Sequence, residues 1–422
     1  MLYRLILSIG LILHLSEGYA QSITQQVFTH FINYSTQDGL SSNHINDIIQ
    51  DSRGFIWIAT ENGLNRYDGY RFISFYHDPY DSLSIPGNTV LSLALDSDDN
   101  LWIGTTKGLC RLSLSNGTMQ RFLAQAGKTE TPRTNHIRKL LHSECHNTLW
   151  IETLEGTLTS FNLNSGQWNH YSHPAPSQPY YRYHALREDR EGNIWLGGRN
   201  TPIFKFNTSS ETLHTIYARP EDKGGKRDND LADIYQSSAG QWYVVALDGI
   251  YTFNPTTEIF SKIFANSTYS VAEDGHGRIW FASGHGLISF EPINQAFSLY
   301  LHDTDNPYSL AGNHVNRVFV DRAGNIWAGT TKGLSVMSCK SSQFEHYYHI
   351  PGKNYSLSSN EVTSMVQCTK GDVYISTANH GLNIWNPISN SITHLLADRS
   401  NPCSLASNRV SCLYIDQNET IW

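Results

Sequence analysis

The sequence predicts an all-β fold, a seven-bladed β-propeller of four-stranded blades followed by the truncated start of a second propeller. Three observations lead to this prediction: the composition, an internal repeat, and a match between the N-terminal segment and a later one. Of 422 residues, 12% are aromatic, 31 are Gly and only 16% are charged. Such a composition favours a folded chain rich in strands and turns over disorder or long helices.

The internal repeat is the strongest of the three observations. Segments that begin with Asp and reach Trp six residues later, followed closely by a Gly-Leu turn, align on Trp57, Trp102 and Trp327. Weaker copies centre on Trp150, Trp195, Tyr243, Trp280, Tyr374 and Trp422. The period of about 46 residues is that of four-stranded propeller blades.

Each copy divides into four short strands separated by turns. In the first copy we expect strands over residues 44–50, 55–60, 64–67 and 71–76, with Asp, Asn, Ser and Gly at the turns. The residue two positions after the central aromatic is usually small, and we expect it to leave room for an aromatic ring packed between blades. Seven of the ten Trp occupy the central position. We expect these Trp to be core residues, which removes them as evidence for a sugar-binding surface.

The N-terminal segment predicts how the ring closes. Residues 27–34 resemble residues 343–349, and both precede a Leu-Ser-Ser-Asn loop. An open propeller leaves an unpaired sheet edge, so we expect 27–34 to complete the seventh blade beside 334–337. The first propeller then occupies residues 21–340 and the incomplete second one 341–422, which indicates a fragment of a longer protein.

The first twenty residues indicate export. Arg4 precedes an apolar run, and Gly18 and Ala20 place small residues before Gln21. The run is shorter than the roughly 20 apolar residues of a membrane-spanning helix, so residues 1–20 are expected to be a signal peptide and the remainder to be periplasmic. Six irregularly spaced Cys are expected to be mostly unpaired, although an oxidising compartment leaves disulfides open. The net charge of −8 argues against nucleic-acid backbone binding.

The Asp-to-Trp repeat and the connector at residues 78–88, echoed at 303–313 and 398–408, resemble the two-component regulator propeller repeat. In that family the repeats form two tandem seven-bladed propellers outside the inner membrane, followed by an immunoglobulin-like domain, a transmembrane helix and a cytoplasmic histidine kinase. Many members are hybrid sensors of Bacteroidetes that detect carbohydrate fragments and induce polysaccharide-utilisation genes; some relatives carry a cyclase or a DNA-binding output.

The resemblance covers about residues 27–422. It implies a sensor region that binds an oligosaccharide or another small ligand, passes the signal to a kinase and transcriptional output, and works as a homodimer in an inner-membrane receptor. This region is not expected to contact nucleic acid.

The sequence motifs give little support for a catalytic or metal site. The segment 96–100 begins like a calcium loop, but Leu101 stands where such a loop needs Gly, so a hairpin turn is preferred. The 19 His lack metal-binding spacing, and no cofactor, metal or catalytic residue is assigned. Because propeller lyases share the pattern of residues 274–280, a secreted hydrolase or lyase stays an alternative, as does a protein-interaction platform.

Candidate ligand residues come from places where the repeat breaks down. The loops into the fourth and fifth blades combine aromatic rings with cations, which suits a sugar or an anionic glycan. The predicted set is Tyr180, Tyr181, Arg182, Arg199, Lys226 and Arg227. The alternative interpretation is that these are degenerate blades with solvated loops.

Overall fold

The structure, a computed structural model, describes residues 25–26, 30–125, 127–128, 131–154, 157–171, 182–199, 202–216, 231–338, 347–389 and 391–422. The predicted signal peptide lies outside these residues. The chain divides into two compact units, one formed by 1–302 with 308–340 and the other by 303–307 with 341–422. The described residues hold one short 3-10 helix, η1 (Thr36–Asp38), and no helix long and apolar enough to span a membrane.

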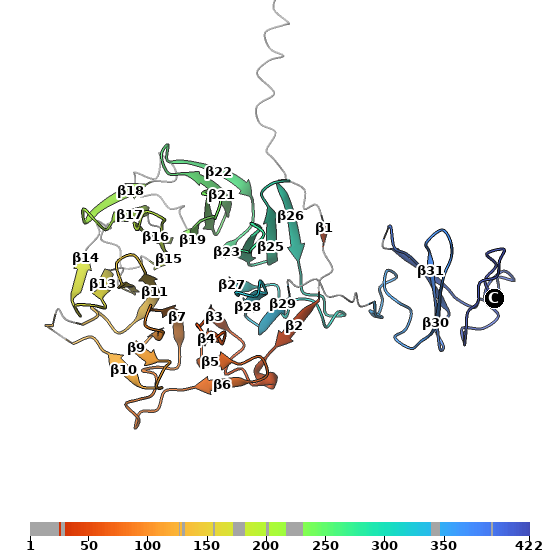
Figure 1. The fold of residues 1–422 in the computed structure, drawn as a ribbon, viewed down its shortest axis with the longest axis horizontal. Helices are drawn as coiled ribbons and strands as arrows, with labels where there is room; N and C mark the ends of the chain where they lie inside the picture. The colour runs from red at the N-terminus through yellow and green to blue at the C-terminus, as the bar shows by residue number, and fades with distance from the viewer. Residues whose placement is uncertain are drawn as a thin grey trace, which may run out of the picture. The chain divides into compact units, whose positions relative to one another are not determined.

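In the described part of the first unit, seven antiparallel sheets form a ring, and the all-β propeller prediction is confirmed (Figure 1). Each inner strand contacts the inner strand of the next sheet, and the last contacts the first. The inner strands are β3 (Ile45–Gln50), β7 (Val90–Leu95), β11 (Ile137–Ser143), β15 (Arg182–Glu188), β19 (Leu231–Gln236), β23 (Thr268–Glu273) and β27 (Val315–Val320).

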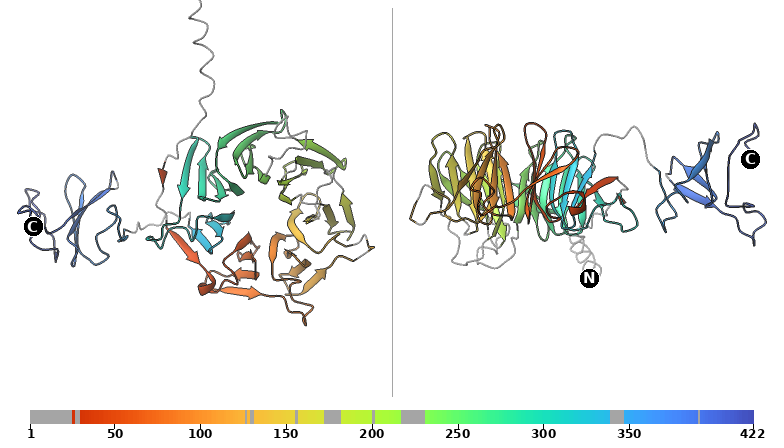
Figure 2. Two further views of the ribbon diagram at one scale, coloured as in Figure 1. Left: turned by 180° about the vertical axis from the view of Figure 1, so that it is seen from behind. Right: turned by 90° about the horizontal axis from the view of Figure 1, so that it is seen from below.

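Three further strands follow outward in each sheet. The second strands are β4 (Ile56–Thr60), β8 (Asn100–Thr105), β12 (Thr148–Thr153), β16 (Ile194–Arg199), β20 (Trp242–Ala246), β24 (Ile279–Ser283) and β28 (Ile326–Thr330). The third strands are β5 (Gly63–Tyr67), β9 (Gly108–Ser113), β13 (Leu158–Asn162), β17 (Ile203–Asn207), β21 (Gly249–Asn254), β25 (Gly286–Glu291) and β29 (Leu334–Met337). The outer strands are β6 (Phe72–Phe75), β10 (Met119–Phe122), β14 (Trp168–Tyr171), β18 (Thr212–Ile216), β22 (Ile259–Phe264) and β26 (Ala296–Tyr300), with β2 (Phe31–Tyr34) in the seventh sheet. The sheets stand side by side around the ring when it is viewed from its edge (Figure 2).

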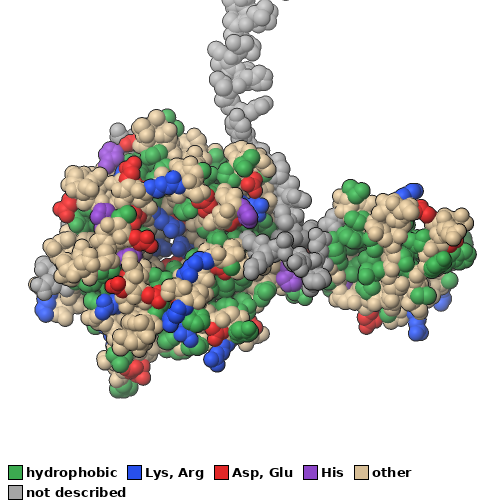
Figure 3. All heavy atoms as spheres, viewed as in Figure 1, with side chains coloured by type: hydrophobic (Ala, Val, Ile, Leu, Met, Phe, Trp, Pro, Cys, Tyr) green, Lys and Arg blue, Asp and Glu red, His purple; other side chains and the backbone are tan. Residues whose placement is uncertain are grey.

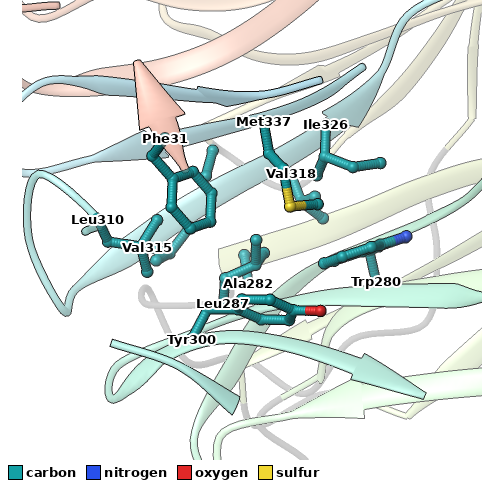
Figure 4. Close-up of a cluster of buried hydrophobic side chains, with 11 residues drawn as sticks. Phe31, Trp280, Ala282, Leu287, Tyr300, Leu310, Val315, Val318, Ile326 and Met337 are labelled. Atoms are coloured by element: carbon teal, nitrogen blue, oxygen red, sulfur yellow. The ribbon is translucent and has the colours of Figure 1, made fainter. Parts of the chain in front are cut away.

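Closure of the ring by the N-terminal segment is confirmed. Strand β2 pairs antiparallel with β29, with Phe31 opposite Met337 and Tyr34 opposite Leu334. Phe31 is only 2% exposed and joins the hydrophobic cluster between the sixth and seventh sheets (Figure 4). Strand β1 (Gln25–Gln26) adds a short parallel strand to β26 of the sixth sheet. The first and last blades are therefore joined by hydrogen bonds and by apolar packing.

The core consists of seven hydrophobic clusters, each between two neighbouring sheets. The small position after the central aromatic serves this packing, but not as predicted. A Cβ atom on Gly104, Gly197 or Gly329 would lie 2.8, 2.4 or 2.6 Å from Ile137, Leu231 or Ile45 of the next inner strand. The prediction that this space holds an aromatic ring is wrong. The space is filled by the first aliphatic side chain of the next inner strand.

The Asp that opens each repeat binds the Trp that centres it. Asp51 accepts the backbone N–H groups of Arg53 and Phe55 through Oδ1, both at 3.0 Å, and the indole N–H of Trp57 through Oδ2 at 2.9 Å. The same indole bond, at 2.8–2.9 Å, joins Asp96 to Trp102, Asp189 to Trp195, Asp274 to Trp280 and Asp321 to Trp327. One carboxylate thus fixes both the hairpin turn and the buried ring, which explains the six-residue spacing.

Three copies lack this bond: the one centred on Trp150, and those centred on Tyr243 and Tyr374, which have Ser237 and Cys368 at the Asp position. Glu144 stands six residues before Trp150, and the buried indole nitrogen of Trp150 has no hydrogen-bond partner in the part of the chain that the structure describes. Trp422 keeps its bond to Asp416 but is 72% exposed, so its predicted place in the core is wrong.

The Asn residues before the inner strands stabilise the connectors that precede these strands. Asn88 accepts the backbone N–H of His77 through its side chain at 2.7 Å, and Asn313 accepts that of His302 in the same way. Asn43, Asn135, Asn360 and Asn408 make equivalent bonds. His77 and His302 in turn bond to carbonyl groups of their own connectors, so position in the repeat accounts for them.

The second unit contains one complete four-stranded sheet. Its strands are β30 (Val362–Gln367), β31 (Val373–Thr377), β32 (Leu382–Asn386) and β33 (Ser391–Leu395), paired in sequence order. After residue 397 a further connector leads to a single bridge between Ile415 and Ile421. The inner-strand residues of this sheet are more exposed than their counterparts in the first unit.

Replacing Phe31 by Ala is expected to destabilise the first unit by about 3–5 kcal/mol, because it removes a buried ring from the closing strand. Ile32 lies on the same strand and is 52% exposed, so Ile32→Ala is the matched control, with an expected loss within about 0.5 kcal/mol. Denaturant unfolding of both variants measures the difference. Equal stability of the two variants would show that β2 does not close the ring.

Replacing Asp96 by Ala is expected to cost about 1–3 kcal/mol, since the buried indole N–H of Trp102 and two backbone N–H groups lose their acceptor. Asp98 is exposed in the same turn, and Asp98→Ala is expected to unfold like the wild type. Thermal unfolding with and without calcium checks both points. A melting temperature that rises with calcium and depends on Asp98 would restore the calcium-loop alternative.

Candidate functional site

The predicted ligand patch is only partly covered by the structure. Arg182 and Arg199 are directly opposite each other in the pairing of β15 with β16, so their backbones are neighbours. Tyr180, Tyr181, Lys226 and Arg227 lie outside the described residues. The patch therefore stays a prediction.

Polar side chains gather near the starts of the inner strands in three successive blades. His44 lies 2.8 Å from Glu61, and His285 lies 3.0 Å from the side-chain oxygen of Asn266. The ring of His314 packs beside that of Tyr269, with centroids 5.0 Å apart. Burial lowers the pKa of His314, and the neighbouring His44 and His285 lower it further. His314 is therefore held neutral near pH 7.

A second polar set lines the middle of the ring. Every inner strand has an irregularity in its pairing with the second strand, and the residue after this bulge holds an equivalent register position. We call these seven residues the inner ring: Asp47, Ser92, Lys139, Ala185, Asp233, Ser270 and Arg317. In the space-filling view the centre of the first unit is hollowed, and Lys and Arg side chains lie around the hollow (Figure 3).

Acceptor groups of the inner ring join each blade to the next. Asp47 Oδ2 accepts the backbone N–H of Leu93 at 3.0 Å, and Ser92 Oγ accepts that of Leu140 at 3.1 Å. Asp233 Oδ2 receives the N–H of the sixth blade's inner strand at 3.3 Å. In the second unit, Ser364 accepts the N–H of Leu413 at 3.1 Å. Among the described residues, every Asp or Ser at this position other than Ser270 accepts a backbone N–H of the next blade.

Two arginines pair with the two acids of the inner ring. Arg187, two residues beyond Ala185 on β15, donates to both oxygens of Asp233 at 3.0 and 2.8 Å, a bidentate pair. Arg317 Nε lies 2.9 Å from Asp47 Oδ1, and Arg317 Nη1 lies 3.9 Å from Asp233 Oδ2. The first pair joins the fourth and fifth blades, and the second joins the seventh blade to the first. Both acids are almost fully buried.

Electrostatics keeps Asp233 ionised. Burial alone would raise its pKa, but Arg187, Arg317 and Lys139 together hold the pKa below its ordinary value of 3.8. An ionised, ion-paired carboxylate is unsuited to donate a proton in general acid catalysis. The inner ring is better suited to binding a charged group than to acid–base chemistry.

Sequence reasoning missed the inner ring, although a signal was present. In six of the seven blades its member stands ten residues before the central aromatic, as Asp47 does before Trp57. Comparing the residue at this position across the repeats would have shown charged residues where the interior of a strand normally holds apolar ones. The described residues contain no group of three or more His, Cys, Asp or Glu placed to hold a metal ion, and the five described Cys are free.

The chain is similar to known proteins in sequence and in structure. The family model described as "Two component regulator propeller" matches residues 39–62, 84–107, 177–200 and 309–332. Each match includes the whole second strand of a sheet, β4, β8, β16 or β28. A stretch of 55 residues is 42% identical to histidine kinase P4 of Formosa agariphila, and it covers 13% of this chain and 4% of that protein.

Solved structures share the fold. The extracellular domain assigned to a hybrid two-component system of B. thetaiotaomicron superposes with a TM-score of 0.78 at 24% identity, over 94% of this chain and 52% of that one. A domain assigned to a one-component system of the same organism gives 0.61 at 22% identity, over 94% and 51%. A streptogramin B lyase gives 0.56 at 13% identity, over 73% of this chain and 98% of the lyase. The chain thus spans about half the length of the two extracellular domains.

Replacing Arg187 by Met is expected to cost about 3 kcal/mol, because Asp233 then stays buried without its bidentate partner. Since the pKa of Asp233 is lower in the folded state, its contribution is present above pH 3.8 and is lost as the pH falls through the folded value. The variant is therefore expected to begin unfolding at a higher pH than the wild type during acid titration.

Lys262→Met is the control for this variant, because it breaks the exposed pair of Lys262 with Asp248, which is worth less than about 1 kcal/mol. Circular dichroism during acid titration follows all three proteins. Acid unfolding of Arg187→Met at the wild-type pH would mean that this pair does not stabilise the ring.

Proposed function

Since the chain carries two-component regulator propeller repeats, we propose that it is the extracytoplasmic sensor region of a transmembrane two-component receptor, a hybrid histidine kinase. The repeat match in four separate segments carries this proposal. The 55-residue likeness to a histidine kinase supports it, as does the fold shared with extracellular domains of B. thetaiotaomicron signalling systems. In this proposal, a cytoplasmic kinase and a transcriptional output lie downstream of residue 422.

The proposed location is the periplasmic side of the inner membrane. The solved neighbours are extracellular domains, which supports a position outside the cytoplasm. Residues 1–20 would then direct export, and a segment beyond residue 422 would anchor the receptor.

The proposed ligand is a carbohydrate fragment, and the proposed mechanism depends on a rigid scaffold. A ring closed by β2 and held by inter-blade bonds changes shape little, so its loops keep a fixed geometry for binding. A ligand shifts a signalling equilibrium only through different affinities for its two states. In a homodimeric receptor, those states would be two arrangements of the sensor regions.

A lyase is the weaker candidate. Its TM-score of 0.56 is lower than the 0.78 of the hybrid-system domain, and its sequence identity is 13%. The shared feature is the propeller itself, which hosts many unrelated activities.

The gene tests the receptor proposal directly. The reading frame beyond Trp422 is expected to encode the rest of a second propeller, one transmembrane helix and a kinase domain. A stop codon soon after Trp422, or an enzyme domain in place of the helix and kinase, would contradict the proposal.

The double substitution Tyr181→Ala with Arg182→Ala tests the predicted ligand patch. The probe is the oligosaccharide, from a panel of polysaccharide digests, that raises the melting temperature of the purified chain most. We expect calorimetry to show at least tenfold weaker binding with an unchanged melting temperature.

Tyr70 and Arg71 form a matched control, because they are an adjacent, exposed Tyr–Arg pair in a turn between third and outer strands. Tyr70→Ala with Arg71→Ala is expected to bind like the wild type. If both double variants bind equally, the loops around residue 181 are solvated connections and not a ligand site.

A further inference from the structure

Lys139 is the cation of the inner ring that lacks a carboxylate partner. It follows the bulge of β11 and pairs in register with Glu152 of β12, as Asp47 pairs with Ala59. Its electrostatic neighbours are Asp47, Asp233, Arg187 and Arg317, contributed by four other blades. Lys139 therefore lies among the charged groups at the centre of the ring.

The other two cations at the centre each have an acid in direct contact, but Lys139 has none. Arg317 lies against Asp47, and Arg187 is bidentate to Asp233. Lys139 makes no ion pair or hydrogen bond with any described residue. Its register partner Glu152 is not within ion-pair distance of it. The following blade places Ala185 at the inner-ring position, where an acid would be the natural partner.

Lys139 is the cation at the centre that stands apart, because the ion pairs of Asp47 and Asp233 are made with Arg317 and Arg187 and not with Lys139. A half-buried cation without a partner is costly, and a structure can offset this cost by binding an anion.

Donors for such an anion are available. The ammonium group of Lys139 has three N–H donors, and each guanidinium has five, of which the acids use only some. The hollow in the space-filling view leaves the centre open to solvent from the face shown (Figure 3).

We propose that the centre of the first ring binds one oxyanion group, a sulfate, phosphate or carboxylate, with Lys139 as its principal ligand and Arg187 and Arg317 as supporting donors. The site is independent of the proposed receptor role, because it follows from Lys139 and its neighbours in the ring alone.

Burial lowers the pKa of Lys139, and Arg317 and Arg187 add to this effect, although Asp47 and Asp233 oppose it. A bound anion would raise this pKa again. Binding is therefore expected to weaken as the pH rises, because Lys139 then loses its proton.

Titration of the purified chain tests the site. Sodium sulfate, sodium phosphate and sodium glucuronate are the probes, each at constant ionic strength set with sodium chloride. We expect at least one probe to bind with 1:1 stoichiometry in calorimetry and to raise the melting temperature. Binding of the inorganic ions would identify a free oxyanion, and binding of glucuronate alone would identify the carboxylate of an acidic sugar; both support the proposal.

Three variants assign the binding to Lys139. Lys139→Met is expected to fold, because it removes an unpartnered charge, and to bind at least tenfold more weakly. Lys139→Arg keeps the charge and is expected to retain binding. Lys370→Met, at an exposed turn of the second unit, is expected to match the wild type. The proposal is overturned if no probe binds saturably, or if Lys139→Met binds within twofold of the wild type.

Discussion

The pairing of β2 with β29 is the contact on which the first unit depends. Six of the seven sheets take four consecutive strands from one stretch of sequence, to which the sixth adds the short β1, whereas the seventh takes its outer strand from the N-terminal end. Without that strand, β29 would present an unpaired edge, and the apolar surface around Met337 would lose Phe31. Because every blade packs only against its two neighbours, a break at this point would leave two blades each covered on one face only.

Given a closed ring, the repeat assigns each position one task. The Asp–Trp hydrogen bond fixes the turn and the ring within a blade, while the small position admits the first aliphatic residue of the next blade. The inner-ring position links neighbouring blades through backbone bonds or ion pairs. Departures from the repeat then have a physical meaning: Trp150 lacks its acceptor, and Lys139 brings a cation to a position that holds an acceptor in four other blades.

The fold could be predicted from the sequence because each blade corresponds to one repeat of about 46 residues. Trp57 and Trp102 mark equivalent strands, and residues 27–34 resemble residues 343–349 closely enough to predict the closure. Side-chain partners were harder to predict, since they depend on which residues of different blades meet. The indole bond to Asp51 and the Ile45 side chain over Gly329 both require the three-dimensional register. The charges at the centre come from residues 47 to 317, and no local pattern brings them together.

Amide hydrogen exchange of the closing strand tests the central claim, that the N-terminal strand makes seven blades one cooperative unit. The amides of Phe31–Tyr34 are predicted to exchange as slowly as those of Ile326–Thr330, because both belong to the same hydrogen-bonded sheet. Exchange of Phe31–Tyr34 within seconds, while β27, β28 and β29 stay protected, would contradict the claim.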